Sequence, residues 1–161
     1  MKMDLVKAGA SVAGNRQYRE WVKSLKSKIR RAQAKAAVRV NEELMRLYWE
    51  MGRDIAEKRM EAEYGSGFFG SLSKDLKQEF PNMEGFSVSN LKYIKRFYLF
   101  YAASDRIGRK EGIGGSSNRQ QPVDDLKNLF LVPWGHNIEI FTHAKSVDEA
   151  LFYVCKTVEN G

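Results

Sequence analysis

Two carboxylate–lysine triplets are the residues of this sequence whose spacing could support metal-dependent hydrolysis. Asp75-Leu76-Lys77 and Asp125-Leu126-Lys127 each place an acid two positions before a lysine. A nuclease gathers several carboxylates around a hard divalent cation, whereas each triplet lies in a predicted helix with no second acid on a neighbouring strand. We therefore predict that the chain has no catalytic site, and that a metal-dependent cleavage assay on it gives a blank result.

The two histidines and the single cysteine form no motif for metal binding or nucleophilic attack. His136 and His143 lack the spacing of a zinc site, and the sequence has neither a phosphate-binding loop nor a nucleophile elbow. His136 is expected to be a hydrogen-bonded residue beside a buried Trp134. Cys155 lies in an apolar run and is expected to be a small buried residue in a reducing cytoplasm. These residues predict no cofactor, no metal and a cytoplasmic location.

A cluster of polar and cationic residues is suited to binding phosphates and base edges. Ser87, Ser89 and Asn90 fall in the first turn of a predicted helix, and Lys92, Lys95 and Arg96 follow them. Serine and asparagine contact phosphate oxygens or base edges, while lysine and arginine neutralise phosphates. We predict DNA contacts from all six, with Ser89 and Asn90 as the candidates for base contacts. A packed helix pair with a solvated basic face is the alternative interpretation.

The positive charge of the chain is concentrated near its N-terminus. The formal net charge is +7, yet residues 1–60 hold 15 Lys and Arg against 7 Asp and Glu, and residues 111–161 hold 4 against 7. Within 16–39 there are nine cations and one acid. Such a block suits a polyanion, although a solvated helix face would look the same. Arg30, Arg31 and Lys35 are the predicted phosphate contacts.

The element that carries this charge is a long helical region, from Arg16 to about Ala62. It contains no proline, and apolar or small residues recur at steps of three or four: Tyr18, Val22, Leu25, Ile29, Ala32, Ala36, Val40, Leu44, Leu47, Met51 and Ile55. The pattern predicts one helix, or two with a break near 32–37. The alanine-rich first half is thin, whereas the second half should join a core. Residues 1–14 are predicted to be a flexible tail before a domain at 15–161.

The remaining elements are also predicted to be helical. A helix at 71–80, a turn at 81–85 and a helix at 87–102 with Ser87 as its N-cap have the outline of a helix-turn-helix. A flexible connector at 104–121 precedes helices at 123–131 and 138–144, and a capping box at 146–149 opens the last helix. No strand pattern and no apolar run of membrane-spanning length is present. The predicted fold is all-α.

Several short sequence patterns resemble the N-terminal domain of the YhcG family. They are Asn41, Leu47-Tyr48-Trp49, Gly52, Tyr64-Gly65, Leu72 to Leu76, Glu79-Phe80-Pro81, Gly85-Phe86-Ser87, Asn90-Leu91, Phe97-Tyr98, Pro133 to Asn137, and Tyr153 with Glu159-Asn160-Gly161. The resemblance covers 18–161. It implies a winged-helix-like DNA-binding module that precedes a PD-(D/E)XK nuclease domain, in proteins linked to DNA cleavage, repair or defence.

The sequence departs from this family pattern in two places. It ends at Gly161, where family members continue into the nuclease, so no catalytic acid or lysine can be assigned here. The glycine-rich stretch at 108–115 is longer than the corresponding stretch in the family. The wing that the resemblance implies is therefore not established at this position.

Two functions are therefore expected from the sequence. The first is a DNA-binding module without a catalytic site, which holds DNA with little sequence preference for an attached nuclease domain. It requires that the cations of the two helical stretches converge on one surface. The alternative is a scaffold for that nuclease without DNA contact, in which the stripe from Tyr18 to Ile55 forms a homodimer or docks a protein. Neither function involves a membrane.

Overall fold

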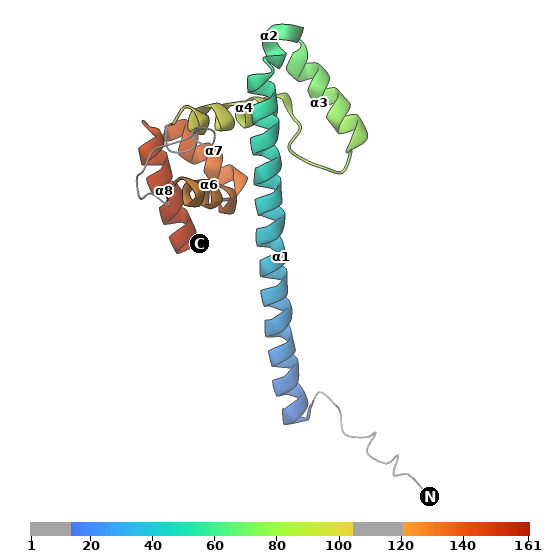
Figure 1. The fold of residues 1–161 in the computed structure, drawn as a ribbon. Helices are drawn as coiled ribbons and strands as arrows, with labels where there is room; N and C mark the ends of the chain where they lie inside the picture. Colours follow the sequence, from blue (N-terminus) through green and yellow to red (C-terminus); the bar gives the residue numbers. More distant parts are fainter. Residues whose placement is uncertain (1–13, 105–120) are drawn as a thin grey trace, which may run out of the picture. The chain divides into compact units, whose positions relative to one another are not determined.

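The computed structural model describes residues 14–104 and 121–161, with the backbone alone for 121–124. The described parts are helical and contain no strand, which confirms the predicted all-α fold (Figure 1). The helices are α1 (Arg16–Glu57), α2 (Met60–Tyr64), α3 (Phe68–Glu79), α4 (Val88–Ala102), α6 (Gln121–Leu131), α7 (Trp134–His143) and α8 (Val147–Asn160). Three predicted features lie outside the described residues: the tail at 1–14 apart from Gly14, the glycine-rich stretch at 108–115, and nearly all of the connector at 104–121.

α1 is continuous, so of the two predicted alternatives the structure has the single helix and not the helix pair with a break near 32–37. The Asn15 side chain caps its start, because Oδ1 accepts hydrogen bonds from the backbone N–H groups of Gln17 (2.8 Å) and Tyr18 (3.3 Å). The helix ends at Glu57 and not near Ala62 as predicted. Arg59 adopts a left-handed conformation, with φ of 48°, and this reversal separates α1 from α2.

The chain forms two compact units, one that ends at Val40 and one from Asn41 to Gly161. The buried apolar core belongs to the second unit, and its first member is Met45. The second half of the α1 stripe joins this core, as predicted: Ile55 is buried, and Leu44 and Met51 are partly buried and pack against the core. The buried positions are Met45, Tyr48, Gly52 and Ile55, whereas Leu47 is exposed.

Aromatic residues bring α1, α4 and α7 together at the centre of the second unit. Phe97 of α4 is fully buried, and its ring lies 5.5 Å from Trp49, 5.4 Å from Trp134 and 6.0 Å from Phe141, centroid to centroid. The Trp49 and Trp134 contacts are edge-on, the arrangement that aromatic quadrupoles favour. α8 packs against α6 and α7, and α7 packs against α4 (Figure 1).

Two asparagines satisfy backbone carbonyls at the end of α6. Asn137 is fully buried, and its Nδ2 donates to the carbonyl oxygens of Leu129 (3.1 Å) and Val132 (2.9 Å). Asn41 of α1 donates from Nδ2 to the carbonyl of Phe130 at 3.2 Å. The last carbonyls of a helix have no partner within it, so these side chains stabilise the end of α6.

The last two helices begin at residues suited to helix N-termini. α7 begins at Trp134, four residues before the predicted start, with Pro133 as its N-cap. The predicted start was wrong because Pro133 and Gly135 do not interrupt the helix: a proline just before a helix lacks only an N–H that would be unpaired there. Ser146 caps α8 as predicted, and its Oγ accepts a hydrogen bond from the N–H of Glu149 at 3.1 Å.

A single buried hydroxyl connects α3 to the segment before α4, and its removal should be measurable. Ser73 is 5% exposed, and its Oγ donates to the carbonyl of Phe86 at 2.6 Å. We expect Ser73→Ala to lower the free energy of unfolding by about 1–2 kcal/mol, because the Phe86 carbonyl loses a buried partner. Chemical denaturation checks this, with the exposed Ser71→Ala as control. Equal stability of the two variants would contradict the prediction.

Candidate nucleic-acid interface

The helix pair α3–α4 and its turn determine where the predicted polar residues lie. α3 ends at Glu79, Gly85 has a φ of +102°, which favours glycine, and Ser87 caps α4. The Ser87 Oγ accepts from the N–H of Asn90 at 3.1 Å, as the sequence predicted. A hydroxyl that accepts this bond keeps its own O–H to donate to a ligand.

Ser89, Lys92 and Arg96 share one exposed face of α4. Their spacing of three and four residues places them on adjacent turns of the same side, and all three are exposed. The buried side of α4 consists of other positions, Leu91, Ile94, Phe97 and Tyr101. The sequence of α4 contains no acidic residue. Three of the predicted contact residues thus form a continuous polar and cationic strip, called here the α4 strip.

The two cations of the α4 strip lie over aromatic rings. The Lys92 Nζ is 5.9 Å from the centroid of Phe69 in α3, and the Arg96 guanidinium is 5.6 Å from Tyr93 and 6.0 Å from Phe141. Within the part of the chain that the structure describes, neither cation forms an ion pair. Their positive charge is therefore available to an external anion, because a ring face attracts a cation without neutralising it.

Lys95, three residues after Lys92, differs from the two cations of the α4 strip because it has a carboxylate partner. Its Nζ forms an ion pair with Glu61 Oε2 of α2 at 2.7 Å. The hydrogen bond and the charge of Lys95 lower the pKa of Glu61. Lys95 would have to leave Glu61 to reach a phosphate, which makes it a weaker candidate contact than Lys92 or Arg96.

Asn90 uses both ends of its side-chain amide inside the protein. Nδ2 donates to the carbonyl of Gly85 at 2.6 Å, and Oδ1 accepts from the Trp134 indole Nε1 at 2.7 Å. Tyr48 is also in contact with this group: burial raises its pKa, and a hydrogen bond with Asn90 partly offsets that rise. Asn90 therefore holds the turn before α4 against α7. The sequence contained the relevant residues, but their pairing depends on the fold.

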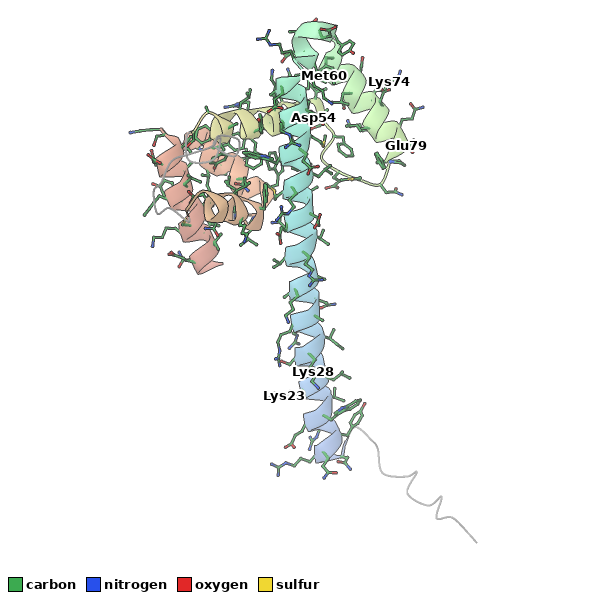
Figure 2. All side chains as sticks on the ribbon, in the orientation of Figure 1. Lys23, Lys28, Asp54, Met60, Lys74 and Glu79 are labelled. Carbon is green, nitrogen blue, oxygen red and sulfur yellow. The ribbon has the colours of Figure 1, made fainter. Side chains whose placement is uncertain are left out.

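The basic segment of α1 is exposed along its length. Arg30, Arg31 and Lys35 are all exposed, and so are Lys23 and Lys28, which were not among the predicted contacts (Figure 2). In the sequence, the only signal for these two lysines as phosphate contacts is the concentration of positive charge at 16–39. In the described residues, the one ion pair of this segment joins Arg16 Nε to Glu20 Oε1 at 3.1 Å. Convergence of these cations with the α4 strip stays a prediction.

The residues considered for catalysis are dispersed. Asp75 and His136 are exposed, whereas Asp125 is buried in α6. Trp134, expected to be buried beside His136, is only half-buried, and so is Cys155, whose Sγ lies 3.7 Å from Asn128 Nδ2. Among the described residues, no group of three or more His, Cys, Asp and Glu could hold a metal ion. The same residues include no helix both long and apolar enough to cross a bilayer.

Comparison of the sequence with known proteins identifies the family of this chain. The model of the DUF1016 N-terminal domain matches residues 24–161. No curated protein and no solved structure matches the chain. The match covers most of the sequence and confirms the resemblance to the N-terminal domain of the YhcG family, while no catalytic domain is matched. The chain therefore belongs to the DUF1016/YhcG family, as the N-terminal domain that precedes a nuclease domain.

Proposed function

We propose that this chain is a DNA-binding module that positions an attached nuclease domain on DNA and has no catalytic site itself. The observation that carries the proposal is the α4 strip: Ser89, Lys92 and Arg96 share an exposed face of a helix without acids. The second support is the exposed basic segment of α1. The third is the place of this domain before a nuclease domain in its family.

The contacts available to these side chains suit the DNA backbone better than the bases. Lysine contacts a phosphate as a point charge, and a guanidinium can contact it with two parallel hydrogen bonds. The stacking of Arg96 on Tyr93 and Phe141 restricts its orientation, so less side-chain entropy is lost on binding. Ser89 remains the candidate for a base-edge contact, since both ends of the Asn90 amide already have partners. We therefore propose DNA binding with little sequence preference.

The expected result for the α4 strip is a loss of affinity and of salt dependence. We expect Lys92→Ala/Arg96→Ala to weaken binding to duplex DNA about tenfold at low salt. It should also reduce the slope of log K against log salt by about 2, because two phosphate contacts are lost. Fluorescence anisotropy at several salt concentrations measures both quantities.

The matched control for this double variant is Lys127→Ala/Lys145→Ala. It removes two exposed lysines from α6 and from the segment between α7 and α8, so the change in net charge is the same. Lys95→Ala should have a smaller effect than Lys92→Ala, because Lys95 is paired with Glu61. If the control weakens binding as much as the double variant does, net charge alone explains binding and the α4 strip is not the interface.

A docking scaffold is the second candidate, and one observation favours it. Leu25, Ile29 and Trp21 of α1 are exposed apolar side chains, at 37%, 48% and 59%. Clustered exposed apolar side chains are typical of protein-binding surfaces. A chain that assembles through this face and ignores DNA at low salt would support the scaffold and overturn the DNA-binding proposal.

A further inference from the structure

The first half of α1 carries an apolar seam that no residue of the core covers. Val22, Leu25, Ile29, Ala32 and Ala36 follow one another at steps of three and four, and all but the half-buried Val22 are exposed. The buried core begins only at Met45. In the described residues, the one aromatic contact of this segment joins Tyr18 and Trp21, whose ring centroids are 6.2 Å apart.

The spacing of the seam is that of a two-stranded coiled coil. In a heptad frame with Val22 at position a, Ile29 and Ala36 also occupy a, while Leu25 and Ala32 occupy d. β-Branched residues at a with leucine at d favour two-stranded pairing. The alanines leave room for a close approach of the opposing helix. Because only the a and d positions are regularly apolar, the stripe is narrow and suits one helix better than a broad apolar surface.

The positions beside the seam determine what kind of helix fits. Arg19 and Lys26 occupy e positions, and Lys28 and Lys35 occupy g positions, so the charged e and g residues from Arg19 to Lys35 are all cations. Side chains at e and g form the interhelical ion pairs that select a partner. A second copy of residues 18–36 would bring seven cations and one acid toward seven cations and one acid. A helix with Glu or Asp beside its apolar stripe would instead pair with these cations.

We propose that the first half of α1, residues 18–36, docks an acidic amphipathic helix of a partner protein as a two-stranded coiled coil. This inference develops the docking candidate and does not depend on DNA binding. Lys23 and Arg30 lie at b and Arg31 at c, which face away from the seam. The same helix can therefore present arginines to a polyanion while its apolar side is covered.

The test uses the full chain and two synthetic peptides of about three heptads, which matches the length of residues 18–36. Both peptides carry Ile at a and Leu at d. One has Glu at every e and g, and the other has Lys there. We expect the Glu peptide to bind at least about tenfold more tightly in anisotropy titrations, and its affinity to fall with salt. Equal binding of both peptides, or of neither, would overturn the proposal.

Two variants separate this proposal from DNA binding. Leu25→Gln/Ile29→Gln should reduce Glu-peptide binding at least about tenfold, since two apolar side chains leave the interface, while duplex DNA binding is retained. Arg30→Ala/Arg31→Ala should weaken DNA binding and leave the peptide affinity within about twofold. Both variants change exposed residues outside the core, and circular dichroism checks that the helices are retained.

Sedimentation of the chain alone measures whether the seam pairs with a second copy. A monomer in the micromolar range is expected. A stable dimer that Leu25→Gln/Ile29→Gln dissociates would assign the seam to a second copy and overturn the acidic partner. Binding to anionic lipid vesicles that is lost in the same variant, with no binding of the Glu peptide, would assign it to a membrane surface and overturn the proposal as well.

Discussion

Gly52→Ala is expected to lower the free energy of unfolding by about 2–3 kcal/mol. Gly52 lies in α1 where that helix crosses α4. A Cβ atom at this position would lie 2.5 Å from the carbonyl oxygen of Ile94 and 2.8 Å from the Cβ of Tyr98. Both neighbours are atoms that cannot rotate away, so the two helices would have to separate.

The intrinsic helix preference opposes this effect but is smaller. Alanine is favoured over glycine in a helix by about 1 kcal/mol, which Gly52→Ala would gain. Separation of α1 from α4 would also disturb the contacts of Trp49 with Phe97 and Tyr98. Packing strain and lost aromatic contact therefore outweigh the gain in helix propensity.

The matched control is Gly70→Ala in α3. Gly70 is exposed and helical, and a Cβ there would meet no atom within 4 Å. We expect this variant to be as stable as the natural chain, or up to about 1 kcal/mol more stable. Urea unfolding of both variants, with unchanged m-values, measures the difference. If Gly52→Ala were as stable as Gly70→Ala, α1 and α4 could not be packed as closely as the structure shows.

Replacement of Asn90 by alanine is expected to cost about 2–4 kcal/mol of unfolding free energy, because two groups lose their partners at once. They are the Gly85 carbonyl and the Trp134 indole N–H, and the hydrogen bond between Asn90 and the Tyr48 hydroxyl is lost as well. Asn90 is only half-buried, so water can reach part of the site and the lower end of this range is favoured. The control is Asn82→Ala, at an exposed position of the turn before α4. A cost of Asn90→Ala no larger than that of the control would show that the two hydrogen bonds do not hold the turn.

Asn90→Asp tests the direction of these hydrogen bonds through pH. The carboxylate can still accept from Trp134 Nε1, but it faces the carbonyl of Gly85, to which the amide Nδ2 donated. The protonated acid can donate to that carbonyl, so folding should raise the pKa of this aspartate. Relative to the natural chain, the variant should be most stable below the usual aspartate pKa and lose stability as the pH rises through the raised value. A stability difference that does not vary between acidic and neutral pH would contradict the hydrogen-bond assignment.

Gly52 and Asn90 also determine how firmly α4, the helix that carries the α4 strip, is packed in the fold. Ser89, Lys92 and Arg96 are presented by α4, whose buried face packs on α1 through Gly52 and whose first turn is held by Asn90. A DNA-binding defect in a Gly52 or Asn90 variant is therefore expected to follow its loss of stability. Substitutions in the α4 strip itself should lower affinity at unchanged stability.

The sequence predicted those features that depend on residues near one another along the chain. The bounds of α4 and the Ser87 and Ser146 caps follow from hydrogen bonds that span only three residues, so local patterns were sufficient. The helical period and the absence of proline likewise predicted a long helical region that begins at Arg16, although α1 ends at Glu57 and not near Ala62. The exposed spacing of Lys92 and Arg96 followed from the period of α4 once its limits were known.

The tertiary structure alone decided which groups meet across the fold. The buried face of α1 contains Met45, Tyr48 and Gly52, because α4 packs closely against the one position without a side chain. Asn90 appeared from sequence to be free for a base contact, but Trp134, 44 residues later, occupies one end of its amide. Hydrophobic periodicity specifies that a helix has an apolar side. Packing between residues far apart in the sequence determines which neighbour covers that side. It also determines which polar groups form hydrogen bonds inside the protein.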